Sequence, residues 1–266
     1  MYDFNYQRPT SLDAAGKAVA AADDGKYLAG GMTLIPTMKQ RLAQPSDLID
    51  LSAIAGLSGI HREGDALVIG ATTSHAEVAN SEEVRSSIPA LAELASHIGD
   101  PAVRVRGTIG GSIANADPAA DYPAAVLGLA ATVETNARSI AADDFFTGLF
   151  ETALDDNELV TAVRFPIPAR AGYAKFPNPA SRYAVVGVMV SEGSGGTRVA
   201  VTGAGASVFR IADMEKALAG DFSPTAVEGI SVSASGLNTD IHASDEYRAH
   251  LVTVMAKRAV AAATKG

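Results

Sequence analysis

The chain has no cysteine and no tryptophan among its 266 residues. Without cysteine it can form no disulfide, bind no iron–sulfur cluster through thiolates and offer no cysteine nucleophile. Its five histidines form no pair at metal-ligating spacing beside a set of carboxylates, so we expect no metal site. The sequence therefore excludes thiol and iron–sulfur chemistry within this chain.

Positive charge and long apolar runs are also scarce. The formal net charge is −9 at pH 7 and the acidic residues are scattered, which argues against a nucleic-acid-binding protein. No apolar run is long enough to cross a membrane, and the first residues lack the basic and apolar regions of a signal peptide. We therefore expect a cytoplasmic protein without a nucleic-acid partner or a membrane span.

Several standard motifs are missing as well. The chain has no strand–GxGxxG–helix fingerprint of a Rossmann NAD site and no P-loop. No Ser-His-Asp arrangement and no pair of catalytic carboxylates stands out. We predict no catalytic residue in this chain, so a bound cofactor has to supply any chemistry.

Two glycine-rich turns are the most informative segments that are present. Residues 27–36 run from a short apolar strand through Gly30 and Gly31 into Thr33, a predicted helix cap. Residues 106–121 combine three more glycines with small polar side chains and two carboxylates. Glycine has no Cβ and lets backbone N–H groups approach an anionic ligand closely. A single glycine turn usually only connects a strand to a helix. The pair of turns predicts a site for a pyrophosphate and the sugar-like chain beside it.

The order of helix and strand signals predicts an α+β fold. The first fifty residues form a small α/β pattern, and a change of composition at residues 167–172 marks a domain boundary. Beyond it we expect an antiparallel meander with helices on one face. The expected helices cover residues 12–22, 33–42, 89–98, 124–129, 211–218 and 246–262, with short helices starting at His75 and Asp143. The expected strands cover residues 27–29, 47–51, 131–134, 138–140, 159–166, 182–191, 198–206 and 208–211, with a hairpin at 57–70.

Several sequence blocks, in order, resemble the FAD-binding medium subunit of molybdenum hydroxylases, the carbon monoxide dehydrogenase and xanthine dehydrogenase family. The blocks are residues 29–36, 41–45, 48–51, 70–73, 99–101, 107–111, 116–123, 173–176 and 182–187. The resemblance implies a two-subdomain FAD-binding domain of the PCMH type at residues 1–168, with subdomains at about 1–54 and 55–168. A C-terminal flavoprotein domain, residues 172–266, would carry the meander and its helices.

The resemblance also implies an FAD site between the two N-terminal subdomains. Residues 29–34 would wrap the pyrophosphate and residues 108–112 would form a second phosphate-side turn. Asp121 would accept a hydrogen bond from a ribityl or ribose hydroxyl, Lys175 would lie near the flavin pyrimidine, and Tyr183 beside the isoalloxazine. The full implied set of cofactor-binding residues is Ala29, Gly30, Gly31, Met32, Thr33, Leu34, Thr72, Thr73, Ser74, Thr108, Ile109, Gly110, Gly111, Ser112, Asp121, Leu159, Val160, Lys175 and Tyr183.

Some of these residues have a purely structural alternative. Asp121 could cap the helix that follows it, Lys175 could be a surface residue, and Tyr183 could pack under the meander. His75 and His97 lie near the turns and could touch a ligand, although a surface or capping role is the more common one.

The chain departs from the family pattern at a few positions near the turns. Ala102 and Val105 stand where the family often has Gln and Asn, and Ser112 stands where Asn is common. Met32 replaces the His or Gln of some relatives. These changes affect side-chain contacts with the cofactor more than backbone contacts.

The function implied by the resemblance is electron transfer. A large subunit with a molybdopterin cofactor would hydroxylate the substrate, and a small subunit with [2Fe-2S] clusters would pass electrons to the FAD held here. The three subunits would form a heterotrimer, and a dimer of heterotrimers is one arrangement that stays open. Two alternatives also stay open, a self-contained FAD oxidase of the PCMH-type family and a non-catalytic assembly module that has lost FAD.

Overall fold

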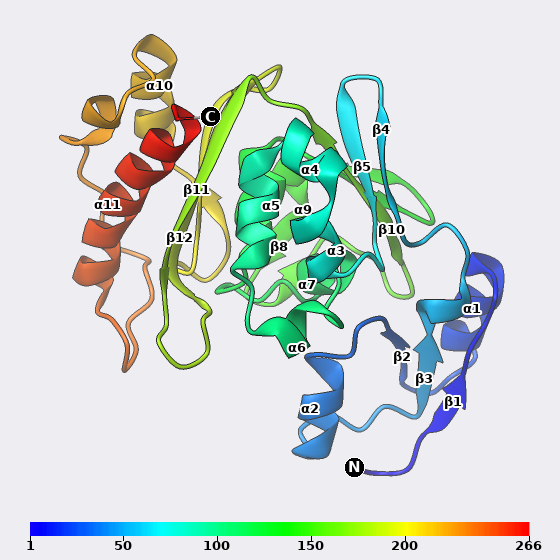
Figure 1. Ribbon diagram of the computed structural model, residues 1–266. Helices are drawn as coiled ribbons and strands as arrows, with labels where there is room; N and C mark the ends of the chain where they lie inside the picture. Colours follow the sequence, from blue (N-terminus) through cyan, green and yellow to red (C-terminus); the bar gives the residue numbers. More distant parts are fainter. Residues whose placement is uncertain (266) are drawn as a thin grey trace.

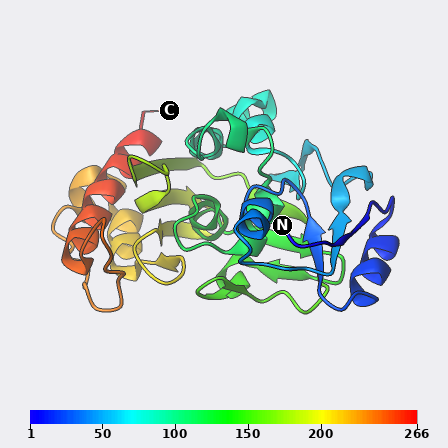
Figure 2. The ribbon, with the colours of Figure 1, turned by 90° about the horizontal axis from the view of Figure 1, so that it is seen from below.

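The computed structural model describes residues 1–265 as a row of packed layers (Figure 1). The N-terminal unit lies at one end and two C-terminal helices lie at the other. Between these ends, two sheets enclose a layer of short helices, and the view from below in Figure 2 shows the same succession. Buried apolar side chains form three clusters, within the N-terminal unit, between the two sheets and under the C-terminal helices. The division into domains at residues 1–168 and 172–266 stays a prediction.

The N-terminal unit is a parallel sheet whose strands are linked through helices. Its elements are β1 (Asn5–Gln7), α1 (Leu12–Ala20), β2 (Gly25–Leu28), α2 (Leu34–Lys39), β3 (Asp47–Asp50) and the 3₁₀ turn η1 (Leu51–Ala53). The sheet order is β1-β3-β2, with both pairings parallel. The side chain of Ser11 caps α1 by accepting a hydrogen bond from the Ala14 N–H at 3.2 Å. The predicted small α/β unit is therefore present.

The middle of the molecule consists of a five-stranded antiparallel sheet covered by helices. Its elements are β4 (Ile60–Glu63), β5 (Ala66–Gly70), α3 (His75–Asn80), α4 (Glu82–Ser87), α5 (Pro89–Ser96), α6 (Pro101–Arg104), α7 (Ile109–Asn115), α8 (Tyr122–Gly128), β6 (Thr132–Thr135), β7 (Ser139–Ala141), α9 (Ala142–Phe145), β8 (Phe146–Gly148), β9 (Glu151–Thr152) and β10 (Val160–Pro166). The sheet order is β4-β5-β10-β6-β7, while β8 and β9 form a separate hairpin. The predicted hairpin at 57–70 and the strand at 159–166 both appear in this sheet.

A four-stranded antiparallel sheet separates the middle helices from the C-terminal ones. Its elements are β11 (Arg170–Pro177), β12 (Ala184–Gly193), β13 (Gly196–Thr202) and β14 (Phe209–Arg210), followed by α10 (Ala212–Gly220), the 3₁₀ turn η2 (Pro224–Val227) and α11 (Asp245–Ala263). One face of the sheet packs against α10 and α11, while Tyr173, Met189 and Ala200 belong to the cluster between the sheets. A Cβ at Gly172 would lie 2.1 Å from the Ala259 carbonyl oxygen, so glycine lets α11 approach β11 closely.

The sheet starts earlier than the sequence pattern indicates. We predicted a domain boundary at residues 167–172 and a first strand at 182, but Arg170–Pro177 forms β11 and pairs along its length with β12. Glycine and charged residues interrupt the apolar alternation of this segment. The strand owes its conformation to β12 and α11 on either side of it, so its local sequence carries little of the signal.

Other short elements were missed, and one predicted cap does not form. The second glycine turn is itself the start of a helix, α7, whose N-cap Thr108 accepts from the Gly111 N–H at 3.2 Å. Thr33 stands at the N-cap position of α2, but its side chain makes no capping hydrogen bond, and α2 ends at Lys39, before the predicted residue 42. The sequence analysis also did not predict β1, α4 or α6. Among residues 1–265, no helix combines the length and apolar character needed to span a bilayer.

Candidate functional site

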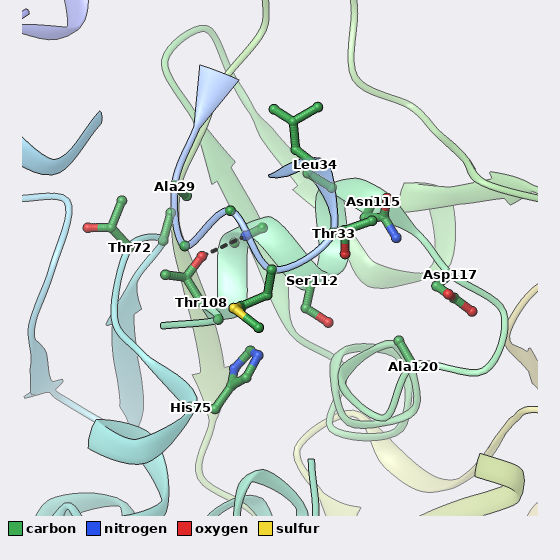
Figure 3. Close-up of a pocket in the computed structure, with 18 of the residues that line it drawn as sticks. Ala29, Thr33, Leu34, Thr72, His75, Thr108, Ser112, Asn115, Asp117 and Ala120 are labelled. Carbon is green, nitrogen blue, oxygen red and sulfur yellow. Dashed lines mark hydrogen bonds between the residues drawn. The ribbon is translucent and has the colours of Figure 1, made fainter. Parts of the chain in front are cut away.

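A cavity of about 690 Å³ lies where the N-terminal unit meets the middle of the molecule. Its walls come from the turn between β2 and α2, the starts of α3 and α7, the loop before β10 and residues 181–183 (Figure 3). Cavities of several hundred cubic ångströms are the usual size for small-molecule and cofactor sites. The cavity is therefore the candidate functional site.

The turn between β2 and α2 offers a row of unpaired backbone donors. Among residues 1–265, no acceptor receives the N–H groups of residues 30–34; the first amide of this turn with a partner is Ile35, which donates to the Gly31 carbonyl at 3.0 Å. A run of backbone amides without a protein acceptor on a cavity wall is suited to an anionic ligand. We call residues 30–34 the amide cradle.

Close backbone packing holds the amide cradle in place. A Cβ at Gly30 would lie 1.9 Å from the Arg106 carbonyl oxygen and 2.9 Å from Gly107 Cα, so only glycine fits. Gly31 has a φ of +71°, in the left-handed region that favours glycine. The two predicted glycine turns therefore lie in direct contact, with residues 106–107 supporting the cradle from below.

The second turn contributes to the cavity in a different way from the first. Its amides are used inside the protein: the Ile109 N–H donates to the Thr73 carbonyl at 3.1 Å and the Gly110 N–H to the Ala71 carbonyl at 2.8 Å. Gly111 and Ser112 donate to the side chain and the carbonyl of Thr108. The amides of residues 109–112 are therefore engaged within the protein, and the role of this segment as a second phosphate-side turn stays a prediction. What this turn offers to the cavity is the side chain of Ser112 and a glycine surface without Cβ atoms.

Asp121 lies in the cavity wall with both carboxylate oxygens engaged. Tyr173 OH donates a hydrogen bond to Asp121 Oδ1 at 2.5 Å, and Lys175 Nζ forms an ion pair with Asp121 Oδ2 at 2.8 Å. Burial raises the pKa of the Asp121 carboxyl, and the charge and hydrogen bond of Lys175 oppose that shift. Asp121 occupies the N-cap position of α8 without a side-chain capping bond, so the capping alternative is not what the structure shows.

Lys175 lies behind the wall and not on it. Its side chain is only 4% exposed, bound to Asp121 and to the His97 carbonyl at 3.1 Å, and it does not line the cavity. The surface alternative for Lys175 is therefore wrong. Lys175 is bound to Asp121, which does line the cavity, and its predicted position near the flavin pyrimidine stays a prediction.

The structure brings most of the predicted site residues together around one cavity. All of them line it except four, Thr73, Ser74, Ile109 and Lys175. Thr73 is fully buried and bonds the backbone of Gly59, and Ser74 forms a capping box with Glu77 at the start of α3. Ile109 is fully buried in the core between the sheets. These residues shape the wall without reaching its surface.

The cavity also contains polar residues that the sequence analysis did not select. His75 lines it although it is buried, and its ring lies 5.3 Å from the ring of Tyr122, centroid to centroid. Burial lowers the pKa of His75 to about 4, with Arg104 adding to the shift, so the imidazole is neutral at pH 7. His97, the other histidine considered, does not line the cavity.

Two further polar residues, Asn115 and Asp117, line the end of the cavity next to Ala120 (Figure 3). Burial raises the pKa of the Asp117 carboxyl, whose Oδ1 accepts from the Ala119 N–H at 2.9 Å. Tyr183 lines the same cavity with 44% of its surface exposed, so it lies at the rim, and the core-packing alternative does not hold. The signal that could have found Asn115 and Asp117 is their position at the end of α7 and just after it, within the second glycine segment.

These features together fit a long, phosphate-bearing ligand between the N-terminal unit and the middle of the chain. The chain belongs to the family described as the FAD binding domain in molybdopterin dehydrogenase, whose model matches residues 2–168. The resemblance found in the sequence blocks is therefore confirmed, and the chain is a component of an oxidoreductase.

The most similar curated relatives and solved structures include subunits of several hydroxylases and dehydrogenases. The chain is 36% identical to the nicotine 6-hydroxylase medium subunit of Paenarthrobacter nicotinovorans, over 96% of this chain and 95% of that one. It is 36% identical to the carbon monoxide dehydrogenase medium chain of Afipia carboxidovorans, over 97% and 95%. Its fold matches a chain of quinoline 2-oxidoreductase from Pseudomonas putida 86 with a TM-score of 0.88 and 29% identity, over 100% and 98% of the two chains.

Proposed function

We propose that this chain is the FAD-carrying electron-transfer subunit of a molybdenum, iron–sulfur and flavin hydroxylase. It accepts electrons from an iron–sulfur subunit and passes them to an external acceptor. The single observation that carries the proposal is the amide cradle, a run of N–H groups without an acceptor among residues 1–265, in the wall of a cavity large enough for a dinucleotide. Similarity along nearly the whole length of the medium subunits supports it.

The residues of the cavity fit FAD at each of its parts. The amide cradle would hold the diphosphate, since several neighbouring N–H groups there have no acceptor among residues 1–265. The hydroxyl of Ser112 and the amide of Asn115 face the cavity and would bind hydroxyls of the chain beside it. Leu159 and Val160, both buried, supply an apolar wall for a ring system.

The protein's own groups bind and orient the cofactor, while the flavin supplies the redox chemistry when bound. The Asp121, Tyr173 and Lys175 cluster fixes the wall next to Tyr183 because each member is hydrogen-bonded within the protein. Tyr183 stands at the rim and would cover one edge of the bound ring.

The partners follow from the same proposal. A large molybdenum-cofactor subunit and a small iron–sulfur subunit complete the enzyme, in line with the medium-subunit names of the relatives. Within residues 1–265, no group of three or more His, Cys, Asp and Glu side chains could hold a metal ion, so the chain relies on partners for its metal chemistry. We place the complex in the cytoplasm. The substrate belongs to the large subunit, and the relatives' names range from carbon monoxide to nicotine and quinoline.

A self-contained FAD oxidase is the main alternative. Enzymes of that kind often tether FAD to a histidine in the glycine turn, and Met32 occupies that place here. The second alternative, an assembly module without FAD, has to explain why residues 30–34 keep a run of backbone amides without an acceptor, among residues 1–265, in the wall of a large cavity.

Co-purification tests the three functions in one experiment. The chain is tagged, expressed in its native host and isolated under mild conditions, and the visible spectrum is read together with the co-eluting bands. Flavin and iron–sulfur absorbance with one larger and one smaller partner supports the proposal. A lone yellow protein that oxidises a substrate unaided contradicts it, and a lone colourless protein that does not take up added FAD indicates the assembly module.

A further inference from the structure

His75 is a buried polar side chain on the cavity wall with no partner of its own. His75 is only 4% exposed, and among residues 1–265 its Nδ1 atom has no hydrogen-bond partner. A buried polar atom without a partner is uncommon and destabilises a fold. Nε2 also has no hydrogen-bond partner among residues 1–265, but unlike Nδ1 it is not fully buried, so it is the ring nitrogen that a ligand in the cavity can reach. Tyr122, against which the ring lies, is also buried with its hydroxyl unpartnered.

The other ring nitrogen of His75, Nε2, lies beside Gly107. A Cβ at Gly107 would lie 2.5 Å from His75 Nε2, so the ring nitrogen is packed against the backbone of Gly107. Gly107 in turn touches Gly30, the first residue of the cradle. Figure 3 shows the imidazole standing toward the glycine turn, between Thr108 and Ala120. Only Gly107 therefore separates His75 from Gly30 of the amide cradle, and His75 lines the same cavity.

The capping of α3 fixes the direction of this side chain. Ser74 and Glu77 form a reciprocal capping box directly at His75, and the His75 N–H donates to the Gly107 carbonyl at 2.9 Å. The backbone on both sides of His75 is therefore held, and the ring is confined between Gly107 and Tyr122. A group held this firmly can contribute to ligand binding without a large ordering cost.

We propose that Nε2 of His75 hydrogen-bonds the cofactor directly, at the polar linker beside the diphosphate. The inference rests on the proposed FAD function. The neutral imidazole carries one donor and one acceptor, so it can pair with a hydroxyl or a phosphate oxygen without bringing a charge into the cavity. His75 is thus a specificity residue for the cofactor, and its role is not confined to packing in the core.

Three substitutions of His75 test the proposal on the full-length chain, first freed of flavin. His75→Leu has a similar volume and no polar atom, His75→Gln keeps a polar group near the position of Nε2, and His75→Asn keeps one only near Nδ1. FAD dissociation constants are measured by flavin fluorescence, and urea midpoints of the cofactor-free proteins are measured by circular dichroism. We expect His75→Leu to weaken FAD binding about tenfold, the effect of one hydrogen bond, with an unchanged or higher urea midpoint. His75→Gln restores most of the affinity and His75→Asn does not.

The results separate this inference from the proposed function. If the wild-type chain binds FAD and His75→Leu binds it equally well, the inference is overturned while the function stands. Weaker binding by His75→Leu together with a lower urea midpoint and no recovery in His75→Gln also overturns it, because His75 would then be a packing residue only. A wild-type chain that binds no FAD contradicts the proposed function itself. ADP as a second ligand locates the contact: an equal loss for ADP and FAD places it on the diphosphate side, and a loss for FAD alone places it on the ribityl side.

Discussion

At the scale of single residues, Gly30 is the position of the amide cradle where a larger side chain has the least room. We expect Gly30→Ala to weaken FAD binding by more than about tenfold, because the added Cβ would force the cradle away from the Arg106 carbonyl oxygen, now at 1.9 Å from the Cβ position. Titration with FAD, followed by fluorescence, measures the loss.

Gly16 provides the matched control for this substitution. It lies inside α1 with no atom within 4 Å of its Cβ position, so Gly16→Ala should leave FAD binding unchanged. The same change should raise the free energy of unfolding by up to about 1 kcal/mol, because alanine has the higher helix propensity. An equal loss of FAD affinity in both variants would mean that the tight packing of Gly30 is not what matters.

His75 should also give the chain a measurable acid sensitivity. Its folded-state pKa of about 4 lies below the ordinary value of 6.5, so the unfolded chain binds the proton more readily between these two pH values. Stability is unaffected above pH 6.5 and falls as the pH decreases toward 4. Relative to His75→Gln, the cofactor-free wild type should lose roughly 2 kcal/mol between pH 7 and pH 5. Urea unfolding of both proteins at the two pH values measures the difference, and parallel curves would show that His75 is not buried neutral.

At the scale of elements, an ion-pair network ties the β6–β7 hairpin to the loop before β10. Glu158 accepts from Arg138 Nε at 3.1 Å and NH2 at 3.0 Å and from Thr135 Oγ1 at 2.6 Å. These hydrogen bonds lower the pKa of Glu158 to about 2, below the ordinary value of 4.5, and the hydrogen bond from Arg138 has the largest effect. The loop carries Glu158 and Leu159, which both line the cavity.

The lowered pKa of Glu158 predicts a loss of stability in acid. The contribution of this carboxylate is complete above pH 4.5 and disappears as the pH falls toward 2, because the proton must then be taken up. Glu158→Gln should cost about 1–2 kcal/mol at pH 7 and much less at pH 3. Urea unfolding at both pH values tests this, and a cost that does not change with pH would show that the charge of Glu158 is unimportant.

Elements with strong local signals were predictable from the sequence, and those stabilised by distant partners were not. The helix at residues 12–22 has a serine cap, and the hairpin at 57–70 has β-type residues around a turn, so both appear in the structure close to the expected positions. The strand Arg170–Pro177 depends on β12 and α11, which the local sequence does not reveal. The amide cradle was predictable because only glycine can form it. His75 was expected near the turns, where it could touch a ligand, but its contact with Gly107 was not predictable, because it joins segments that the sequence does not place together.

At the scale of the whole molecule, one buried ion pair connects the middle of the chain to the C-terminal sheet. Lys175 of β11 reaches Asp121 at the start of α8, and both side chains are 4% exposed. Removing the cation leaves a buried carboxylate without its counter-charge, so Lys175→Met should destabilise the cofactor-free chain by about 3–5 kcal/mol. The double variant with Asp121→Asn should cost clearly less than the sum of the single variants, because the unpaired charge is gone. Urea unfolding of the wild type, the two single variants and the double variant gives the four free energies of this double-mutant cycle. Additive losses of stability would show that Lys175 and Asp121 are not coupled.

The cavity takes its walls from the N-terminal unit, the middle of the chain and residues 181–183, so one bound ligand should stabilise all three. At a free FAD concentration of 100 times the dissociation constant, binding should add about 2.7 kcal/mol to the free energy of unfolding. Hydrogen exchange should then slow most at residues 30–34, whose amides have no acceptor among residues 1–265. The amide of Gly110 serves as the internal control, since it already donates to the Ala71 carbonyl at 2.8 Å and should change only with global stability. If FAD slows exchange at Gly110 as strongly as in the cradle, the ligand stabilises the fold without engaging the amide cradle, and the assignment of residues 30–34 to the diphosphate is wrong.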